Sequence, residues 1–401
     1  MADDMGYSDI GPYGGEIHTP NLDRLAASGV RFSQMYNFAR CCPSRAALLT
    51  GLYPHQAGVG HMTNFIPDAP GYQGFLNESC VTVAEVLRTR GYRTHISGKW
   101  HVGDVAGDPA LPPEMRRGFD RLFGLGSGGN YFHRPELWHD DQPYVDDSED
   151  FYLTDQIADH AVEMIDESAA ADIPFFVYTA FTSPHWPLQA LEEDIARYEG
   201  VYLGGWDATR TARHEELKGL GILDPKWQIT ARDEAVPAWA DVAHGKWEAL
   251  RMAVYAAQVD RMDQGIGRIL DALDRNGLAD NTLLMFLSDN GGCAEFLHEE
   301  GRPEPDEFLA DLKTRDGRSV RVGNDPAIRP GAEDTYMSYD VQWANVSVTP
   351  FRRYKHWVHE GGISTPFIAR WPARIKESRT VHSPAQIIDI TATIIDVAGA
   401  D

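Results

Sequence analysis

The segment RCCPSRAALLTG, residues 40–51, holds two adjacent cysteines directly before a predicted helix. Pro43 suits the first turn of that helix and Gly51 suits its end. Cys41 is therefore expected just before a helix N-terminus, where free backbone N–H groups and the helix dipole attract an anion and lower the pKa of a thiol. Arg45 adds a guanidinium suited to a tetrahedral oxyanion. These residues alone suggest a redox cysteine or a cysteine phosphatase, although the glycine-rich loop of a phosphatase is absent from this stretch.

Oxygen donors form a second group of candidate residues. Asp3 and Asp4 are adjacent near the start of the chain, and Asp289 and Asn290 directly follow the apolar run TLLMFL. Three carboxylates and an amide suit Ca²⁺ or Mg²⁺ far better than zinc. Taken alone, however, the stretch ADDMGYSD is better explained as a solvated acidic N-terminus.

Several of these residues share a position after a predicted buried strand. Lys99 and His101 follow RTHIS, His185 follows FFVYTAF, and the cysteine segment follows VRFSQMYN. Each residue alone is a weak signal, because a single histidine is more often structural and Asp-Asn-Gly is more often a turn. In open α/β sheets, ligands bind at the carboxyl ends of the strands. The shared position therefore predicts one site at one edge of a sheet.

The elements that must position this site alternate between short apolar runs and helical patterns, which indicates an α/β sheet covered by helices. Strands are predicted at 30–37, 93–98, 173–181, 282–288 and 364–372. Helices are predicted at 18–29, 43–50, 81–92, 154–170, about 247–276 and 387–399. Two long segments, about 103–148 and 188–244, show no regular pattern and are expected to be irregular, either as functional lids and rims or as surface insertions without a role.

Length and composition narrow the class of protein. The 401 residues suffice for one large α/β domain or two ordinary ones, and 43% hydrophobic with 24% charged residues is typical of a soluble globular protein. The formal charge of −24 disfavours nucleic acids and anionic membrane surfaces as partners. The apolar runs are too short to span a bilayer, and no signal peptide follows Met1. Four cysteines make a poor disulfide framework, so Cys80 and Cys293 are expected to be buried thiols.

The order of these motifs resembles the sulfatase family. Cys41-Cys42-Pro43-Ser44-Arg45, four further residues and Thr50-Gly51 match the family signature C-x-P-S-R-x-x-x-x-T-G. The stretches ADDMGYSDIG, GKWHVG, SPHWP, SDNGG and PFRRYKHWVHEGG follow in family order over nearly the whole chain. The chain looks most like the bacterial arylsulfatase branch. The resemblance implies the fold of the alkaline phosphatase superfamily, a mixed, mostly parallel sheet flanked by helices.

The resemblance also implies a role for each candidate residue. Cys41 would be oxidised to formylglycine (3-oxoalanine) by a separate maturation enzyme, while Cys42 would be a bystander. Asp3, Asp4, Asp289 and Asn290 would bind Ca²⁺, with Mg²⁺ as an alternative. Arg45 and Lys99 would stabilise the sulfate charge, His101 would act as a base, His185 would protonate the leaving oxygen, and Lys355 would bind sulfate.

Sulfate ester hydrolysis is the favoured function, on an aryl or sugar sulfate as a small-molecule substrate. Phosphate or phosphonate ester hydrolysis on the same scaffold, and an inactive truncated homologue, remain as alternatives. Residues 1–401 are expected to form one catalytic domain. Relative to the family, an apolar strand before Asp3 and a smaller C-terminal antiparallel domain appear to be missing. A missing central strand would expose the edges of its neighbours and weaken metal binding and stability. Periplasmic and cytoplasmic locations both remain open.

Overall fold

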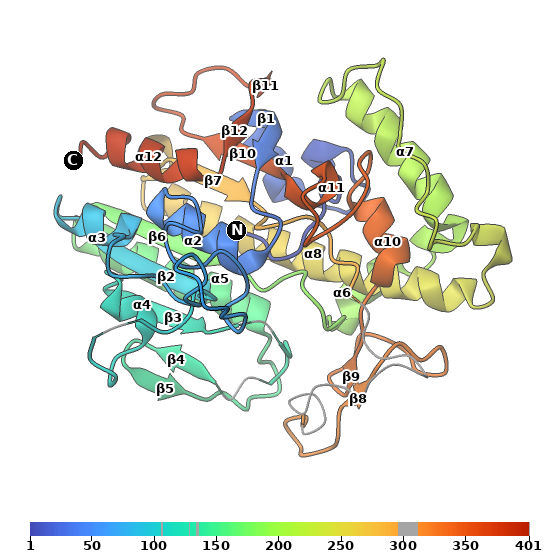
Figure 1. Cartoon of the computed structure of the whole chain (residues 1–401), viewed down its shortest axis with the longest axis horizontal. Coiled ribbons are helices and arrows are strands. Elements are labelled where there is room, and N and C mark those ends of the chain that lie inside the picture. Colours follow the sequence, from blue (N-terminus) through green and yellow to red (C-terminus); the bar gives the residue numbers. More distant parts are fainter. Residues whose placement is uncertain (106, 128, 134–135, 296–311, 401) are drawn as a thin grey trace.

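A computed structural model describes residues 1–105, 107–127, 129–133, 136–295 and 312–400. Its centre consists of two five-stranded sheets that lie edge to edge (Figure 1). The first sheet contains β11 (Arg379–Val381), β1 (Val30–Tyr36), β10 (Ser364–Arg370) and β7 (Leu284–Leu287), with β12 (Ala385–Gln386) also beside β1. The second contains, in spatial order, β5 (Gln142–Tyr144), β4 (Leu137–His139), β3 (Arg121–Leu125), β2 (Arg93–Lys99) and β6 (Phe175–Ala180).

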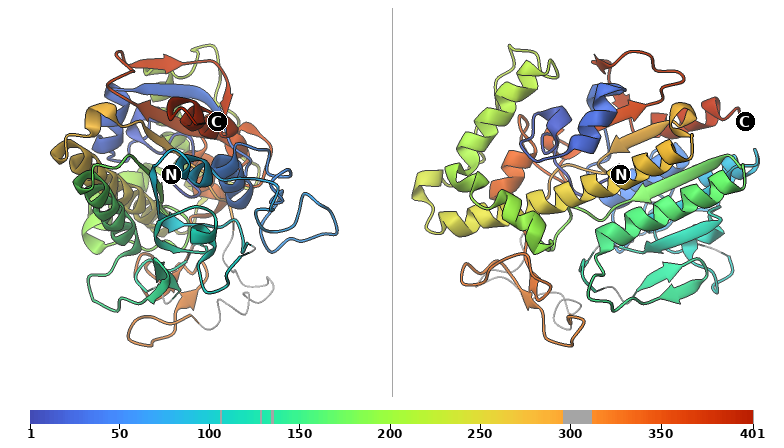
Figure 2. Two further views of the ribbon diagram at one scale, coloured as in Figure 1. Left: turned by 90° about the vertical axis from the view of Figure 1, so that its left-hand side faces the viewer. Right: turned by 180° about the vertical axis from the view of Figure 1, so that it is seen from behind.

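The first residues of the chain join the two sheets. The backbone N–H of Phe181 donates to the carbonyl of Met1 at 3.0 Å, and the N–H of Ala2 donates to the carbonyl of Leu287 at 2.8 Å. Ala2 and Ser288 form a parallel bridge. Residues 1–3 therefore lie between β6 and β7 as a short central strand, and the N-terminus sits in the middle of the molecule (Figure 2).

Strand direction explains why the site forms at one edge. β2 is parallel to both β3 and β6, and residues 1–3 continue this direction to β7. β10 is antiparallel to both β7 and β1, so β7 and β1 point the same way. The carboxyl ends of β1, β2, β6 and β7 therefore meet at one edge, together with the amino end of β10.

Helices cover both faces of the sheets and complete an α/β/α arrangement. One face carries α1 (Pro20–Ala27), α5 (Leu153–Ala170), α6 (Glu192–Tyr198) and α8 (Gly245–Arg275), of which α5 and α8 are clearest from behind (Figure 2). The other face carries α2 (Cys41–Thr50), α3 (Val83–Arg88) and α12 (Ile388–Val397). Successive strand residues point to opposite faces, so Phe286 belongs to the first core and Leu287 to the second.

The remaining elements are short or lie outside the layers. They are η1 (Gly11–Tyr13), α4 (Pro113–Arg116), η2 (Val201–Gly204), α7 (Gly205–Gly219), η3 (Trp239–Asp241), η4 (Ala279–Asn281), α10 (Asp340–Ser347), α11 (Glu360–Ile363) and the projecting pair β8 (Arg321–Val322) and β9 (Thr335–Tyr336). Among the described residues, no helix combines the length and the apolar character that crossing a membrane requires.

The α/β fold and the predicted strands and helices are confirmed, but two segments were predicted wrongly as irregular. Segment 103–148 contains α4, β3, β4 and β5, and segment 188–244 contains α6, η2, α7 and η3. Tertiary contacts hold α7 in place. Arg210 donates to the carbonyl of Asn345 at 3.1 Å, and Arg213 pairs with Asp9 at 2.6 Å.

Beyond Met1, a cavity of about 850 Å³ lies between β6 and β7. Its walls include residues of both strands and apolar side chains from both helix layers, among them Leu48, Leu49, Ile165, Ile266, Ile269 and Ile390. In the described part of the chain, no strand pairs with the edge of β6 between Phe175 and Tyr178 that faces this cavity. The start of the chain, which carries Asp3 and Asp4, therefore borders this cavity at Met1.

Candidate active site

The carboxyl ends of the strands bring the ten predicted site residues into one buried group. Each of the ten has a relative exposure of 8% or less, apart from the half-buried His101. They are Asp3, Asp4, Cys41, Arg45, Lys99, His101, His185, Asp289, Asn290 and Lys355. Lys355 reaches the same edge because it precedes the antiparallel strand β10. The chemical roles of these ten residues are predictions.

The four oxygen-bearing residues converge as expected for a hard cation. The Asn290 amide nitrogen donates to Asp4 Oδ1 at 2.7 Å, and the Asp4 backbone N–H donates to Asp289 Oδ1 at 3.2 Å. Two oxygens in the group, Asp3 Oδ1 and Asn290 Oδ1, are buried without a hydrogen-bond partner. Because an unpaired buried acceptor is costly, both atoms lack an interaction that a bound cation would supply. The donor set therefore fits a Ca²⁺ or Mg²⁺ ion.

Two buried cations lie directly beside this oxygen set. Lys99 Nζ lies 2.6 Å from Asp3 Oδ2, and both side chains are fully buried. The Arg45 guanidinium donates two hydrogen bonds to Asp289 Oδ2, at 3.0 and 2.8 Å. Burial by itself would raise the pKa of Asp3, but Lys99, His185 and Arg45 together lower it far below its usual range. Asp3 is therefore ionised at any physiological pH.

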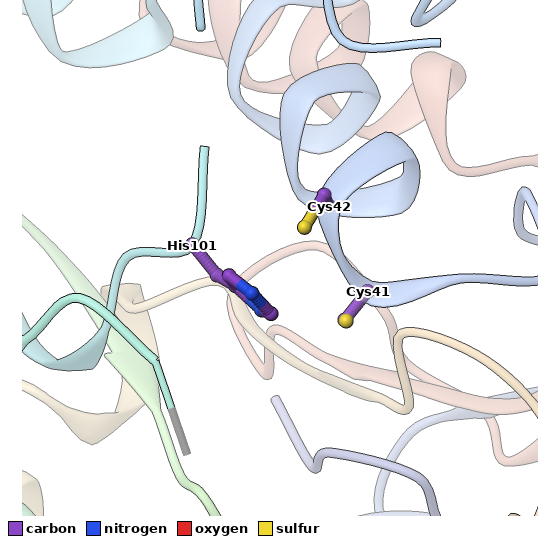
Figure 3. A group of neighbouring side chains, drawn as sticks. All are labelled: Cys41, Cys42 and His101. Atoms are coloured by element: carbon purple, nitrogen blue, oxygen red, sulfur yellow. The ribbon is translucent and has the colours of Figure 1, made fainter. Parts of the chain in front are cut away.

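Cys41 is the first residue of α2, which begins two residues earlier than the predicted helix 43–50. His101 lies opposite, and Figure 3 shows its ring pointing toward the sulfur atoms of Cys41 and Cys42. The hydrogen bond from the thiol of Cys42, and then the positive charges of Lys99 and Lys355, lower the pKa of Cys41 well below its ordinary value despite its burial. Burial lowers the pKa of His101, so its imidazole is neutral at physiological pH. Backbone geometry also marks this position, since His101 has a φ of 55°.

His185 and Lys355 meet at the other side of the oxygen set. Lys355 Nζ donates to Asp4 Oδ2 at 2.8 Å and lies 3.4 Å from His185 Nε2. His185 Nδ1 lies 2.6 Å from the carbonyl of Trp186, so it carries the proton and leaves Nε2 toward the site. Asp4 and Glu295 raise the pKa of Lys355 well above its ordinary value, against the effect of burial. Lys355 is therefore a permanent cation next to a histidine.

Three residues at the mouth of the site were not predicted from the sequence. Glu295 Oε2 accepts from the indole N–H of Trp186 at 3.2 Å and lies 3.8 Å from Lys355 Nζ, while its Oε1 lies 3.7 Å from Arg40. The charge of Lys355 is the main reason why the pKa of Glu295 falls to about 2. Met62 Sδ contacts the sulfurs of both Cys41 and Cys42. Of these three residues, only Arg40 lies in a motif segment of the sequence, directly before Cys41.

Comparisons with known proteins agree with this arrangement. The family model described as Sulfatase matches residues 1–400. The chain is 34% identical to an arylsulfatase of Klebsiella aerogenes, covering all of this chain and 86% of that protein. It is 33% identical to an uncharacterized sulfatase of Schizosaccharomyces pombe, covering 99% of this chain and 74% of that one. Among solved structures, Ps i-CgsB in complex with k-i-k-neocarrahexaose matches with a TM-score of 0.67 and 27% identity, covering all of this chain and 71% of that chain.

Proposed function

The chain belongs to the sulfatase family, and we propose that it hydrolyses an aryl or sugar sulfate monoester at the site around Cys41. One observation carries the proposal: a cysteine at a helix start, four oxygen donors, two histidines and three cations lie in a single buried group. A sulfated small molecule is the substrate class that this family implies. Three buried cations, Arg45, Lys99 and Lys355, are suited to bind its tetrahedral anion.

The proposal assigns the divalent cation to the four oxygen-bearing residues. Asp3, Asp4, Asp289 and Asn290 would hold Ca²⁺, with Mg²⁺ as the alternative, and two of their oxygens lack a hydrogen-bond partner. Once bound there, the ion would polarise a sulfate oxygen and hold the attacking hydroxyl. Asp289 also receives two hydrogen bonds from Arg45, which fix the orientation of its carboxylate.

The nucleophile in this proposal is a formylglycine made from Cys41 by a separate maturation enzyme. Its hydrate would supply two hydroxyls on one carbon, one to attack sulfur and the other to expel sulfate as the carbonyl re-forms. The chain's contribution is to fix this carbon at the first position of α2, where free backbone N–H groups face the anion. Cys42 lies next to it and takes no part.

The remaining roles follow from position and charge. Lys99 and Arg45 are buried cations that would stabilise negative charge on the hydrated residue and on sulfate. His101 is neutral because burial lowers its pKa, so its ring can accept a proton from residue 41. His185 and Lys355 lie together on the other side. There His185, when both of its ring nitrogens carry a proton, would give the Nε2 proton to the leaving oxygen, and Lys355 would bind the sulfate.

The test compares hydrolysis of 4-nitrophenyl sulfate and 4-nitrophenyl phosphate by protein co-produced with a maturation enzyme. We expect a clear preference for the sulfate and a loss of about 10⁴-fold or more in C41A. The neighbouring C42A variant is the matched control and should retain activity. A preference for the phosphate, or equal activity of the wild type and C41A, would contradict the proposal.

A further inference from the structure

Three sulfur atoms and an imidazole meet at the start of α2. The donors are the thiols of Cys41 and Cys42, the thioether of Met62 and the ring of His101. Both cysteines are fully buried at the start of α2, and His101 follows β2 (Figure 3). Sulfate ester hydrolysis as proposed uses neither Cys42 nor Met62, and it uses Cys41 only after its sulfur is gone.

The distances match those between ligands of a single metal ion. Met62 Sδ lies 3.9 Å from Cys41 Sγ and 3.7 Å from Cys42 Sγ. The donor atoms of Cys41, Cys42 and His101 all lie within 4.8 Å of one another. A tetrahedral ion with metal–sulfur bonds of about 2.3 Å separates its sulfur ligands by about 3.8 Å. The Met62 sulfur and both thiols thus lie at the spacing of metal ligands, and a ring nitrogen of His101 lies within 4.8 Å of both thiols.

The chemistry of the donors selects the kind of ion. Two thiols, a thioether and an imidazole are soft ligands, and the thioether in particular favours Cu(I) over Zn²⁺. Asp3, Asp4, Asp289 and Asn290 are hard ligands suited to Ca²⁺. We propose that the folded chain, while Cys41 is still a cysteine, binds one Cu(I) ion through Cys41, Cys42, Met62 and His101. The two cation sites would then be adjacent but chemically distinct.

Binding at this site requires no change of oxidation state. Cu(I) enters as Cu(I), each thiol that becomes a thiolate ligand releases its proton to solvent, and no other bond forms or breaks. A cavity of about 440 Å³, lined by Met62 and His101 among others, offers a route to the donors. The ion would coordinate the sulfur of Cys41 and the ring of His101 at the same time. Occupation is therefore a property of the unconverted chain alone, because an aldehyde at position 41 has no sulfur.

The test uses protein produced without a maturation enzyme, with the thiol at position 41 verified by mass spectrometry. Under anaerobic conditions, Cu(I) held as its coloured bicinchoninate complex is titrated with this protein, and the loss of colour reports transfer of the ion. We expect one equivalent to transfer. C42A and M62L should each weaken binding about tenfold or more, since each removes one sulfur ligand and M62L keeps the volume. C80A, which removes another buried thiol, should bind like the wild type.

Thermal melts of each variant exclude unfolding as the cause of weaker binding. No transfer to the wild type would overturn the proposal, and so would unchanged binding in both C42A and M62L, or a loss of binding in C80A. The outcome does not depend on the sulfatase activity. A chain that never hydrolyses a sulfate ester could still bind Cu(I), and a chain that is fully converted should not.

Discussion

At the scale of single residues, Asp4 connects more of the site than any other carboxylate described. Its Oδ1 accepts a hydrogen bond from Asn290, while its Oδ2 lies 2.8 Å from Lys355 Nζ and 3.3 Å from His185 Nε2. Asp4 adopts a φ of 66°, a conformation that Asp tolerates better than most residues. A cation on Asp4 would compete with Lys355 for the same oxygen. We therefore expect metal binding to release Lys355 toward the substrate.

The proposed role of His185 as an acid predicts a dependence on the leaving group. H185A should lower kcat about 10²- to 10⁴-fold for alkyl or sugar sulfates, whose leaving oxygens need a proton. The loss should be much smaller for 4-nitrophenyl sulfate, because 4-nitrophenolate leaves without protonation. Measuring kcat for a series of phenyl sulfates of graded phenol pKa checks this. A loss of the same size for every leaving group would show that His185 does not act as the acid.

A buried glutamate outside the site predicts how stability changes with pH. Glu114 is 4% exposed, and burial raises its pKa from 4.5 to about 7. The folded pKa exceeds the unfolded one, so the stabilisation is complete below about pH 4.5 and is lost as pH rises through about 7. Relative to E114Q, the wild type should lose up to about 3 kcal/mol of unfolding free energy between these limits.

Urea unfolding at pH 5 and pH 8 measures this difference for the wild type and E114Q. The exposed Glu234 provides a matched control, because E234Q removes a solvated carboxylate and should follow the wild type. If the unfolding free energies of the wild type and E114Q changed in parallel with pH, Glu114 would not be protonated in the folded protein, and the prediction would be wrong.

At the scale of the elements, the strand ends and the main helices were predictable, whereas the elements within segments 103–148 and 188–244 were not. The runs that form β6, β7 and β10 are largely apolar, and β1, β2, β6 and β7 are followed by unusual polar residues, so the positions of these strands could be inferred. β3 is only five residues long and gains its place by parallel pairing with β2. Such pairing is a long-range contact, which local patterns do not reveal.

A void lies beside residues 1–3, between β6 and β7. We predict that filling it with apolar side chains raises the stability of the fold. The Met1 amino group is buried at the end of this void and donates to the carbonyl of Thr179 at 2.7 Å. Burial lowers its pKa to about 5, so the group is uncharged near neutral pH. A six-residue apolar, β-branched extension before Met1 should fill the void as a strand between β6 and β7. It should raise the melting temperature by about 3 °C or more and strengthen Ca²⁺ binding at Asp3 and Asp4.

A Gly/Ser extension of the same length is the matched control, because it lengthens the backbone at the same edge without supplying apolar side chains. Scanning calorimetry and calcium titration compare the two extended chains with the original. Equal melting temperatures and equal calcium affinities for all three would contradict the idea that this void weakens the site.

At the scale of the whole molecule, the candidate site is assembled from nearly every part of the chain. Asp3 and Lys355 are separated by most of the sequence, yet each interacts with the same small group. The motif residues could be predicted because each lies in a recognisable stretch. Glu295 and Met62 could not, since each lies in a loop without a motif and reaches the site only through the fold.

Because the oxygen donors come from distant segments, calcium should stabilise the whole fold. Asp3 and Asp4 lie at the start of the chain, while Asp289 and Asn290 follow β7. Calcium at about 100 times its Kd should add about 2.7 kcal/mol of stability, and a chelator should remove it. D289N should abolish the effect, whereas D280N, at an exposed aspartate, should preserve it. A melting temperature that calcium leaves unchanged would contradict a cation site formed by these residues.

The most direct test of the central claim is the mass of the peptide that contains Cys41, taken from protein co-produced with a maturation enzyme. Conversion of the thiol to an aldehyde lowers the mass by about 18 Da, whereas ordinary cysteine oxidations add oxygen and raise it. We predict the lower mass at Cys41 and an unchanged Cys42, in the same preparation that cleaves the aryl sulfate. Unmodified thiols at both positions in protein that hydrolyses sulfate esters would contradict formylglycine as the nucleophile.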